Sequence, residues 1–256
     1  MTEEERFTEY VRNYNPEDPL IRLKIVHTWK VVEAADAIAQ SLDLTERERR
    51  LVHLAALFHD IGRFEQARRY HTFVDAKSVS HARLGAQILE EGDFLDQLSE
   101  KEREQVIEAV RVHSDYQIPA EDQGFQKVLD DIIRDADKID IFRCSIMENP
   151  DVMSCQSQEG IADDVISDSV AQAILSNQSV KRDSRASALD YWVSYLGFIF
   201  DLNTEKAREL ILEAGYWDQR LRMLLDEQIL RNPQTRECLE QLLDHTSKAL
   251  HASAEK

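Results

Sequence analysis

Apolar residues recur every three or four positions along most of this chain, a period typical of helices with one buried face. The clearest example is the stripe that begins at Leu20 and continues through Leu23, His27 and Val31 to Ile38. The pattern predicts helices over about 20–40, 46–60, 81–91, 99–114, 125–142, 161–176, 186–201, 204–214, 216–230 and 234–251. No stretch shows convincing strand alternation, so we expect an all-α fold.

Polar segments separate these helices. The first 19 residues are mostly polar, and no helix is assigned to them. Gly62 is expected to end the second helix, as glycine often does, and residues 63–79 are expected to be a loop rich in Arg, Lys and aromatic residues. The strongest break falls at 146–160, and helical patterning continues on both sides of it. We therefore interpret residues 1–256 as a single all-α domain with a C-terminal helical extension over 160–256.

Composition narrows the functional classes. The net charge of −18 argues against a protein that grips extended nucleic acid, although it leaves room for a small phosphorylated substrate. The acidic start is unlike a signal or transit peptide, and the longest apolar window, 191–202, is shorter than the ~20 residues that cross a membrane. The three cysteines form no C-x-x-C pair. These features predict a cytoplasmic protein in a reducing compartment, with no membrane partner.

The stretch LAALFHDIGRFEQ, residues 54–66, places two ionisable side chains, His59 and Asp60, at the end of an apolar run. Other predicted helices each carry a similar residue on an apolar face, and these residues are His27, His81, His113 and Asp137. Burying several such groups is costly unless a shared charge compensates them, and a divalent metal would supply that charge. The alternative is a set of unrelated, hydrogen-bonded core residues. His53 is assigned a packing role or a role in supporting a ligand.

The ordered pattern His27 … His59-Asp60 … Asp137 resembles the H…HD…D signature of the HD-domain superfamily of metal-dependent phosphohydrolases. The surrounding segments ALFHDIGRF and RDADKIDIF fit the same signature, and the resemblance covers about 20–145. It implies that this core is a helical bundle carrying a metal site.

The resemblance also implies roles for single residues. His27, His59, Asp60 and Asp137 would ligate one divalent ion. His81 and His113 match the extra pair of members that hold a second ion, with Asp60 bridging both. The expected cofactors are two divalent ions, drawn from Mn, Fe, Co, Ni, Zn and Mg. Apart from the resemblance, position adds Arg63, close to His59 and Asp60, and Lys138, beside Asp137, to Asp60 as expected catalytic residues, because their cations would bind a phosphate oxygen.

The leading hypothesis is hydrolysis of a small phosphomonoester or phosphodiester, with a nucleotide as the expected substrate. A di-iron oxygenase on the same fold is the second hypothesis, and a non-catalytic nucleotide-sensing module is the third. The large cyclic-dinucleotide phosphodiesterase branch has Lys where this chain has Arg63, and its Gly-Tyr-Pro motif is absent after His113. A cyclic-dinucleotide substrate is therefore not predicted, and the sequence leaves the oligomeric state open.

Overall fold

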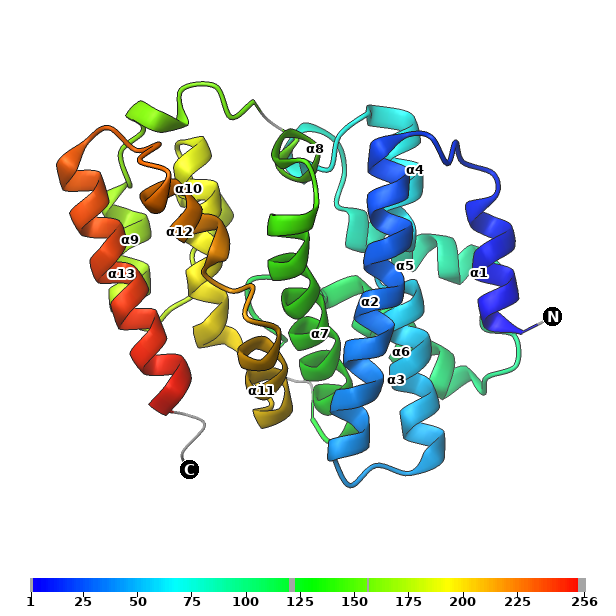
Figure 1. Cartoon of the computed structure of the whole chain (residues 1–256). Coiled ribbons are helices and arrows are strands. Elements are labelled where there is room, and N and C mark those ends of the chain that lie inside the picture. The colour runs from blue at the N-terminus through cyan, green and yellow to red at the C-terminus, as the bar shows by residue number, and fades with distance from the viewer. Residues whose placement is uncertain (1, 120–122, 156, 253–256) are drawn as a thin grey trace. The chain divides into compact units, whose positions relative to one another are not determined.

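The computed structural model describes residues 2–119, 123–155 and 157–252, and within these ranges the regular structure is helical, with no strand (Figure 1). This confirms the expected all-α fold. The chain forms two compact units, residues 1–140 and 141–256. The interpretation of 1–256 as a single domain stays a prediction.

The described residues of the first unit form six α-helices and most of a seventh. They are α1 (Glu3–Val11), α2 (Pro19–Ser41), α3 (Glu46–Phe58), α4 (Ile61–Tyr70), α5 (His81–Glu91), α6 (Glu100–Val112) and α7 (Phe125–Met147), with a short 3₁₀ turn, η1 (Asp75–Lys77), before α5. Helix α3 packs between α2 and α6, and α5 packs between α4 and α6. Figure 1 shows α2, in blue, beside α3, in lighter blue.

Capping residues fix where these helices begin. Thr45 starts α3 with a reciprocal capping box to Glu48, and Ser80 accepts a hydrogen bond from the backbone of Arg83 at the start of α5. From its cap, α3 carries an apolar face that is fully buried from Ala55 to Phe58, and this burial fixes the direction in which the following residues point.

Two expectations about this unit were wrong. The polar first segment forms α1, because Thr2 and Glu5 make a capping box and Phe7 is buried against the aromatic rings of Phe58 and Phe64. The expected loop 63–79 is helical as far as Tyr70, so only its second part is a loop with the η1 turn.

Gly62 does not end a helix, which corrects a further expectation. It lies inside α4, where a Cβ atom would come within 2.2 Å of the carbonyl oxygen of His81 and 2.6 Å of the backbone nitrogen of Gly85. Glycine is therefore required by the close approach of α4 to α5 and not by a left-handed backbone conformation. This crossing brings the end of α3 next to the start of α5.

The second unit contains the end of α7, several α-helices and short 3₁₀ helices. They are α8 (Pro150–Ser154), η2 (Ile161–Asp163), α9 (Asp168–Leu175), η3 (Arg182–Ser184), α10 (Ala188–Val193), η4 (Ser194–Asp201), α11 (Glu205–Ala214), α12 (Gln219–Asp226) and α13 (Pro233–Ala252). Helix α13 packs on α9 and η4. The helix expected over 186–201 is α10 followed by the tighter 3₁₀ helix η4, and the ones expected over 161–176 and 216–230 are shorter than predicted.

Among the helices in the described part of the chain, none has both the length and the apolar composition of a membrane-spanning segment.

Candidate metal centre

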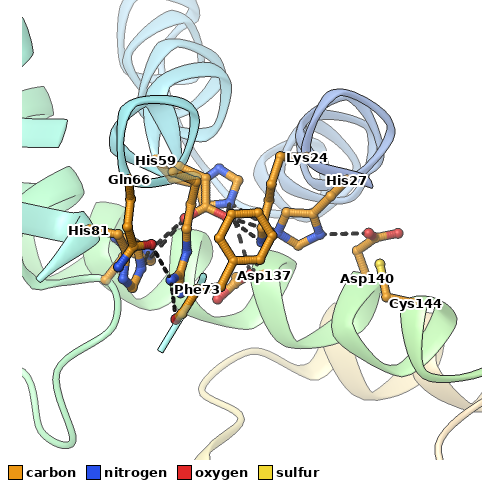
Figure 2. A network of polar contacts seen from close by, with 12 residues as sticks. Lys24, His27, His59, Gln66, Phe73, His81, Asp137, Asp140 and Cys144 are labelled. Carbon is orange, nitrogen blue, oxygen red and sulfur yellow. Dashed lines mark hydrogen bonds and ion pairs between the residues drawn. The ribbon is translucent and has the colours of Figure 1, made fainter. Parts of the chain in front are cut away.

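The first unit brings the predicted ligands together from separate elements. His27 lies on α2, His59 and Asp60 occupy the turn between α3 and α4, and Asp137 lies on α7. His81 is the first residue of α5 and His113 directly follows α6. The four histidines and Asp60 are buried, and Asp60 is only 2% exposed. Figure 2 shows the side chains from α2, α5 and α7 converging.

Asp60 lies between two pairs of imidazoles. Its Oδ2 atom is 3.5 Å from Nε2 of His27 and 3.5 Å from Nε2 of His59. Its Oδ1 atom is 3.5 Å from Nε2 of His81 and 3.8 Å from Nε2 of His113. Asp137 joins the first pair, with Oδ1 3.1 Å from Nε2 of His27. Two groups of three side chains that could hold a metal ion therefore share Asp60: one with His27 and His59, and one with His81 and His113.

The Nδ1 atom of each imidazole faces a hydrogen-bond acceptor that is not one of the predicted ligands. Nδ1 of His27 is 2.7 Å from Oδ2 of Asp140, and Nδ1 of His81 is 2.8 Å from Oδ2 of Asp75. Nδ1 of His59 and Nδ1 of His113 each lie 2.7 Å from a backbone carbonyl oxygen one helical turn earlier. Because carbonyl and carboxylate oxygens accept, each Nδ1 is assigned the proton, and each Nε2 then presents its lone pair to the cluster.

This arrangement fits divalent cations. Nε2 of His27 lies 3.2 Å from Nε2 of His59, and Nε2 of His81 lies 3.2 Å from Nε2 of His113. Lone pairs that face each other at this distance repel unless a positive charge lies between them. In addition, Oδ1 of Asp60 is buried and accepts no hydrogen bond from the described residues. Imidazole and carboxylate donors with unsatisfied lone pairs are the ligand set that divalent transition metals take.

The charge states of the cluster suit ligation. Burial lowers the pKa of His81 to about 4 and that of His113 to about 3, so both imidazoles are neutral near pH 7. Burial alone would raise the pKa of Asp60, but the Lys24 ammonium and the Arg63 guanidinium hold it well below the ordinary value.

The predicted cation Arg63 lies beside the cluster. Its Nε is 3.4 Å from Oδ1 of Asp60 and makes no hydrogen bond to the described residues. Its Nη1 donates to the carbonyl oxygen of Phe73 at 2.7 Å and to side-chain oxygens of Gln66 and Asp75. These bonds hold the α4–α5 connection in place while one edge of the guanidinium stays directed at Asp60.

The remaining residues singled out from the sequence take different places. Lys138 is buried on α7 directly after Asp137. His53 hydrogen-bonds through Nδ1 to Asp36 at 3.0 Å, and its Nε2 lies 3.2 Å from Glu4. None of these contacts of His53 reaches the ligand cluster.

Sequence reasoning missed two residues at the centre and left a third without a role. Lys24 binds Asp60 through an ammonium 2.6 Å from Oδ2, and Asp75 holds both His81 and Arg63. The third is Asp140, three residues after Asp137, whose contact with His27 the sequence pattern does not predict. Lys24 carried a usable signal, since it precedes His27 by three residues and therefore shares its helix face.

Comparison with known proteins gives one match. A family model described as HD domain matches residues 25–141, a segment that contains all six predicted ligands. No curated protein and no solved structure matches the chain.

Proposed function

We propose that this protein, whose residues 25–141 match the HD domain model, is a divalent-metal-dependent phosphohydrolase that cleaves a small phosphomonoester or phosphodiester, with a nucleotide as the expected substrate class. HD domains belong to a superfamily of metal-dependent hydrolases, most of which act on phosphoesters. The observation that carries the proposal is the position of Asp60 between two imidazole pairs, with one carboxylate oxygen directed at each pair.

The proposal assigns the ligands to two ions that share Asp60. His27, His59 and Asp137 would hold one ion, and His81 and His113 would hold the other. When bound, the two ions would supply Lewis acidity to a phosphoryl group and make hydroxide available near neutral pH.

The protein's own residues would keep this site open and oriented. The turn at Asp60, with φ −107° and ψ 18°, separates α3 from α4 and directs the carboxylate into the cluster. The Nδ1 acceptors fix the ring orientation of each imidazole, so that four Nε2 atoms face inward before any ion binds. The free edge of the Arg63 guanidinium and the ammonium of Lys138 would bind oxygens of the phosphoryl group and hold it at the centre.

The test is metal analysis followed by a phosphoester screen. We expect the purified protein to contain up to two divalent ions per chain and to release phosphate from small phosphoesters in their presence. His59→Asn should reduce the metal content and abolish phosphate release. His245→Asn is the matched control, because His245 lies in the second unit, is partly exposed and hydrogen-bonds to Asn177.

Oxygen uptake provides the contrary outcome. A protein that holds a redox-active iron pair, consumes oxygen with a candidate substrate and releases no phosphate would contradict the proposal and support the oxygenase hypothesis. Full phosphate release by His59→Asn would show that the reaction occurs elsewhere.

A further inference from the structure

Lys24 introduces a positive charge into the centre that no ligand assignment uses. Its ammonium lies 2.6 Å from Oδ2 of Asp60, the oxygen that also faces Nε2 of His27 and His59. The side chain is 12% exposed, and Asp60 is its ion-pair partner among the described residues. A buried ammonium beside a proposed ligand oxygen is a direct competitor for that oxygen.

Lys24 is also one of two cations that border the same aromatic ring. Its Nζ lies 5.4 Å from the centroid of the Phe73 ring, and the guanidinium carbon of Arg63 lies 5.2 Å from the same centroid. The same two cations approach different oxygens of Asp60: Lys24 lies next to Oδ2 and Arg63 next to Oδ1. Figure 2 shows the Phe73 ring in front of the cluster, close to Lys24.

Charge decides what happens to this arrangement when divalent ions bind. An ammonium and a divalent ion at the same carboxylate oxygen repel each other strongly in a buried site, where screening is weak. The ion has more charge, and Lys24 sits on a flexible four-carbon stem. Lys24 must then find another anion nearby, and a phosphoryl group drawn to the ions supplies one.

We propose that Lys24 is a phosphate-binding residue that occupies Asp60 in the metal-free centre and transfers its ammonium to a phosphoryl oxygen once divalent ions take the carboxylate. Arg63 binds the same group from the other side of Asp60, and the Phe73 ring lies against both cations. This inference rests on the proposed function and adds a residue that recognises the phosphoryl group. It involves no covalent step, because only the partner of the ammonium changes.

The test uses Lys24→Met, which keeps the apolar stem and removes the charge. Two equilibria are measured by calorimetry on the full chain: binding of Mn²⁺ to the metal-free protein, and binding of inorganic phosphate to the Mn²⁺-loaded protein. Loss of the competing ammonium should tighten Mn²⁺ binding by about threefold to tenfold, and loss of the phosphate contact should weaken phosphate binding by about tenfold. A role confined to holding Asp60 in place predicts weaker binding of both.

Controls separate charge from packing. Lys24→Arg keeps the charge and should restore phosphate binding to within about threefold of the unaltered protein. Lys24→Gln repeats the neutral substitution with a polar side chain, so the test survives if Lys24→Met does not fold. Lys30→Met removes a lysine of the same helix that pairs with Glu33 at the surface, and it should change neither constant.

Either of two results overturns the proposal. Unchanged or weaker Mn²⁺ binding by the neutral variants would show that Lys24 does not compete with the ion for Asp60. Unchanged phosphate binding would show that Lys24 makes no contact with phosphate. Both measurements are binding equilibria, so they remain readable if the unaltered protein hydrolyses no phosphoester. That result would contradict the proposed hydrolysis alone, whereas failure of the unaltered protein to bind Mn²⁺ would contradict the metal centre itself.

Discussion

Each compact unit buries a carboxylate, and the two carboxylates are compensated in different ways. Asp190 in α10 of the second unit is 0% exposed and accepts hydrogen bonds from the backbone and hydroxyl of Ser167 and from the backbone of Ala186, at 2.6–2.9 Å. Asp60 in the first unit is equally buried, yet its Oδ1 accepts no hydrogen bond from the described residues, and imidazole nitrogens surround it.

The difference separates a structural carboxylate from a ligand. Backbone and hydroxyl donors bind both oxygens of Asp190. The carboxylate therefore links α10 to the segments before it and requires no added cation. The imidazole nitrogens around Asp60 have their protons directed away from it, so they add lone pairs to a site in which Lys24 donates only to Oδ2. A buried cluster of that kind is complete only with added cations.

The largest expected effect is the loss of metal from Asp60→Asn. The amide keeps the shape of the carboxylate but removes the charge that both proposed ions share. Metal affinity should fall by more than about 100-fold, which is the largest loss expected when a residue that only supports a ligand is replaced. Elemental analysis and Mn²⁺ calorimetry measure the change. Unaltered metal content in this variant would break the comparison, because Asp60 would then be as structural as Asp190.

Asp190→Asn should give the opposite result. In this variant the amide NH₂ group would point at backbone and hydroxyl donors that now bind the carboxylate. Their hydrogen bonds to that position would be lost, so the free energy of unfolding should fall by about 3 kcal/mol. Urea denaturation measures that change. Metal affinity should stay at the value of the unaltered protein. A fall in metal affinity with unchanged stability would show that the second unit contributes to the site.

The metal-free protein should lose stability as the pH falls below 6.5. The folded-state pKa of His81 is about 4 and that of His113 about 3, whereas both imidazoles titrate near 6.5 when unfolded. The unfolded chain therefore binds more protons below pH 6.5, and the free energy of unfolding falls, by about 3 kcal/mol for His81 alone near pH 4.

Urea denaturation between pH 7 and 4.5, with a chelator present, tests this dependence on pH. The window lies above the range in which carboxylates take up most of their protons. His113→Asn removes one of the two imidazoles and should reduce the slope. A flat profile for the unaltered protein would mean that the buried imidazoles are protonated in the folded state, which would remove the argument that their lone pairs face inward.

The fold class and the ligand cluster could be predicted from the sequence because both depend on local patterns of apolar and polar residues. Apolar periodicity places His27, His59 and His113 on buried helix faces. Two adjacent ionisable residues, His59 and Asp60, at the end of an apolar helix are costly to bury unless a positive charge compensates them. The structure brings these residues together where the pattern predicted. Their role as ligands stays a prediction that the geometry supports.

The features that the sequence missed depend on tertiary contacts. Gly62 was interpreted by a local rule for helix ends, but its role is set by the backbone of α5, which lies far away in sequence. Lys24 and Asp75 carry charges that are usually solvated, so only a structure shows them turned toward Asp60 and His81. The α1 helix was missed because a single buried aromatic residue, Phe7, anchors an otherwise polar segment.

A smaller effect is expected from Asp140→Asn, which alters the acceptor that holds Nδ1 of His27 at 2.7 Å. The amide oxygen still accepts, but without the full negative charge that orients the ring and makes Nε2 more basic. Metal affinity should fall by about tenfold, the lower end for residues that support a ligand. Mn²⁺ calorimetry decides the point, and Asp36→Asn, which alters the acceptor of His53, is the matched control. Equal losses in the two variants would show that the contact with Asp140 has no special role.

The smallest effect is expected from His53→Gln, which tests a histidine of α3 whose surroundings are unlike those of His59. The hydrogen bond to Asp36 raises the pKa of His53 above 6.5, so its contribution to stability is present below pH 6.5 and lost as the pH rises through the folded-state value. Because His53 is half-exposed, the substitution should cost less than about 1 kcal/mol at pH 6 and nothing measurable at pH 9. This pH dependence has the opposite sign to that of the buried pair, although the residue type is the same. Mn²⁺ affinity should not change, and a tenfold loss would place His53 among the residues that support the metal ligands.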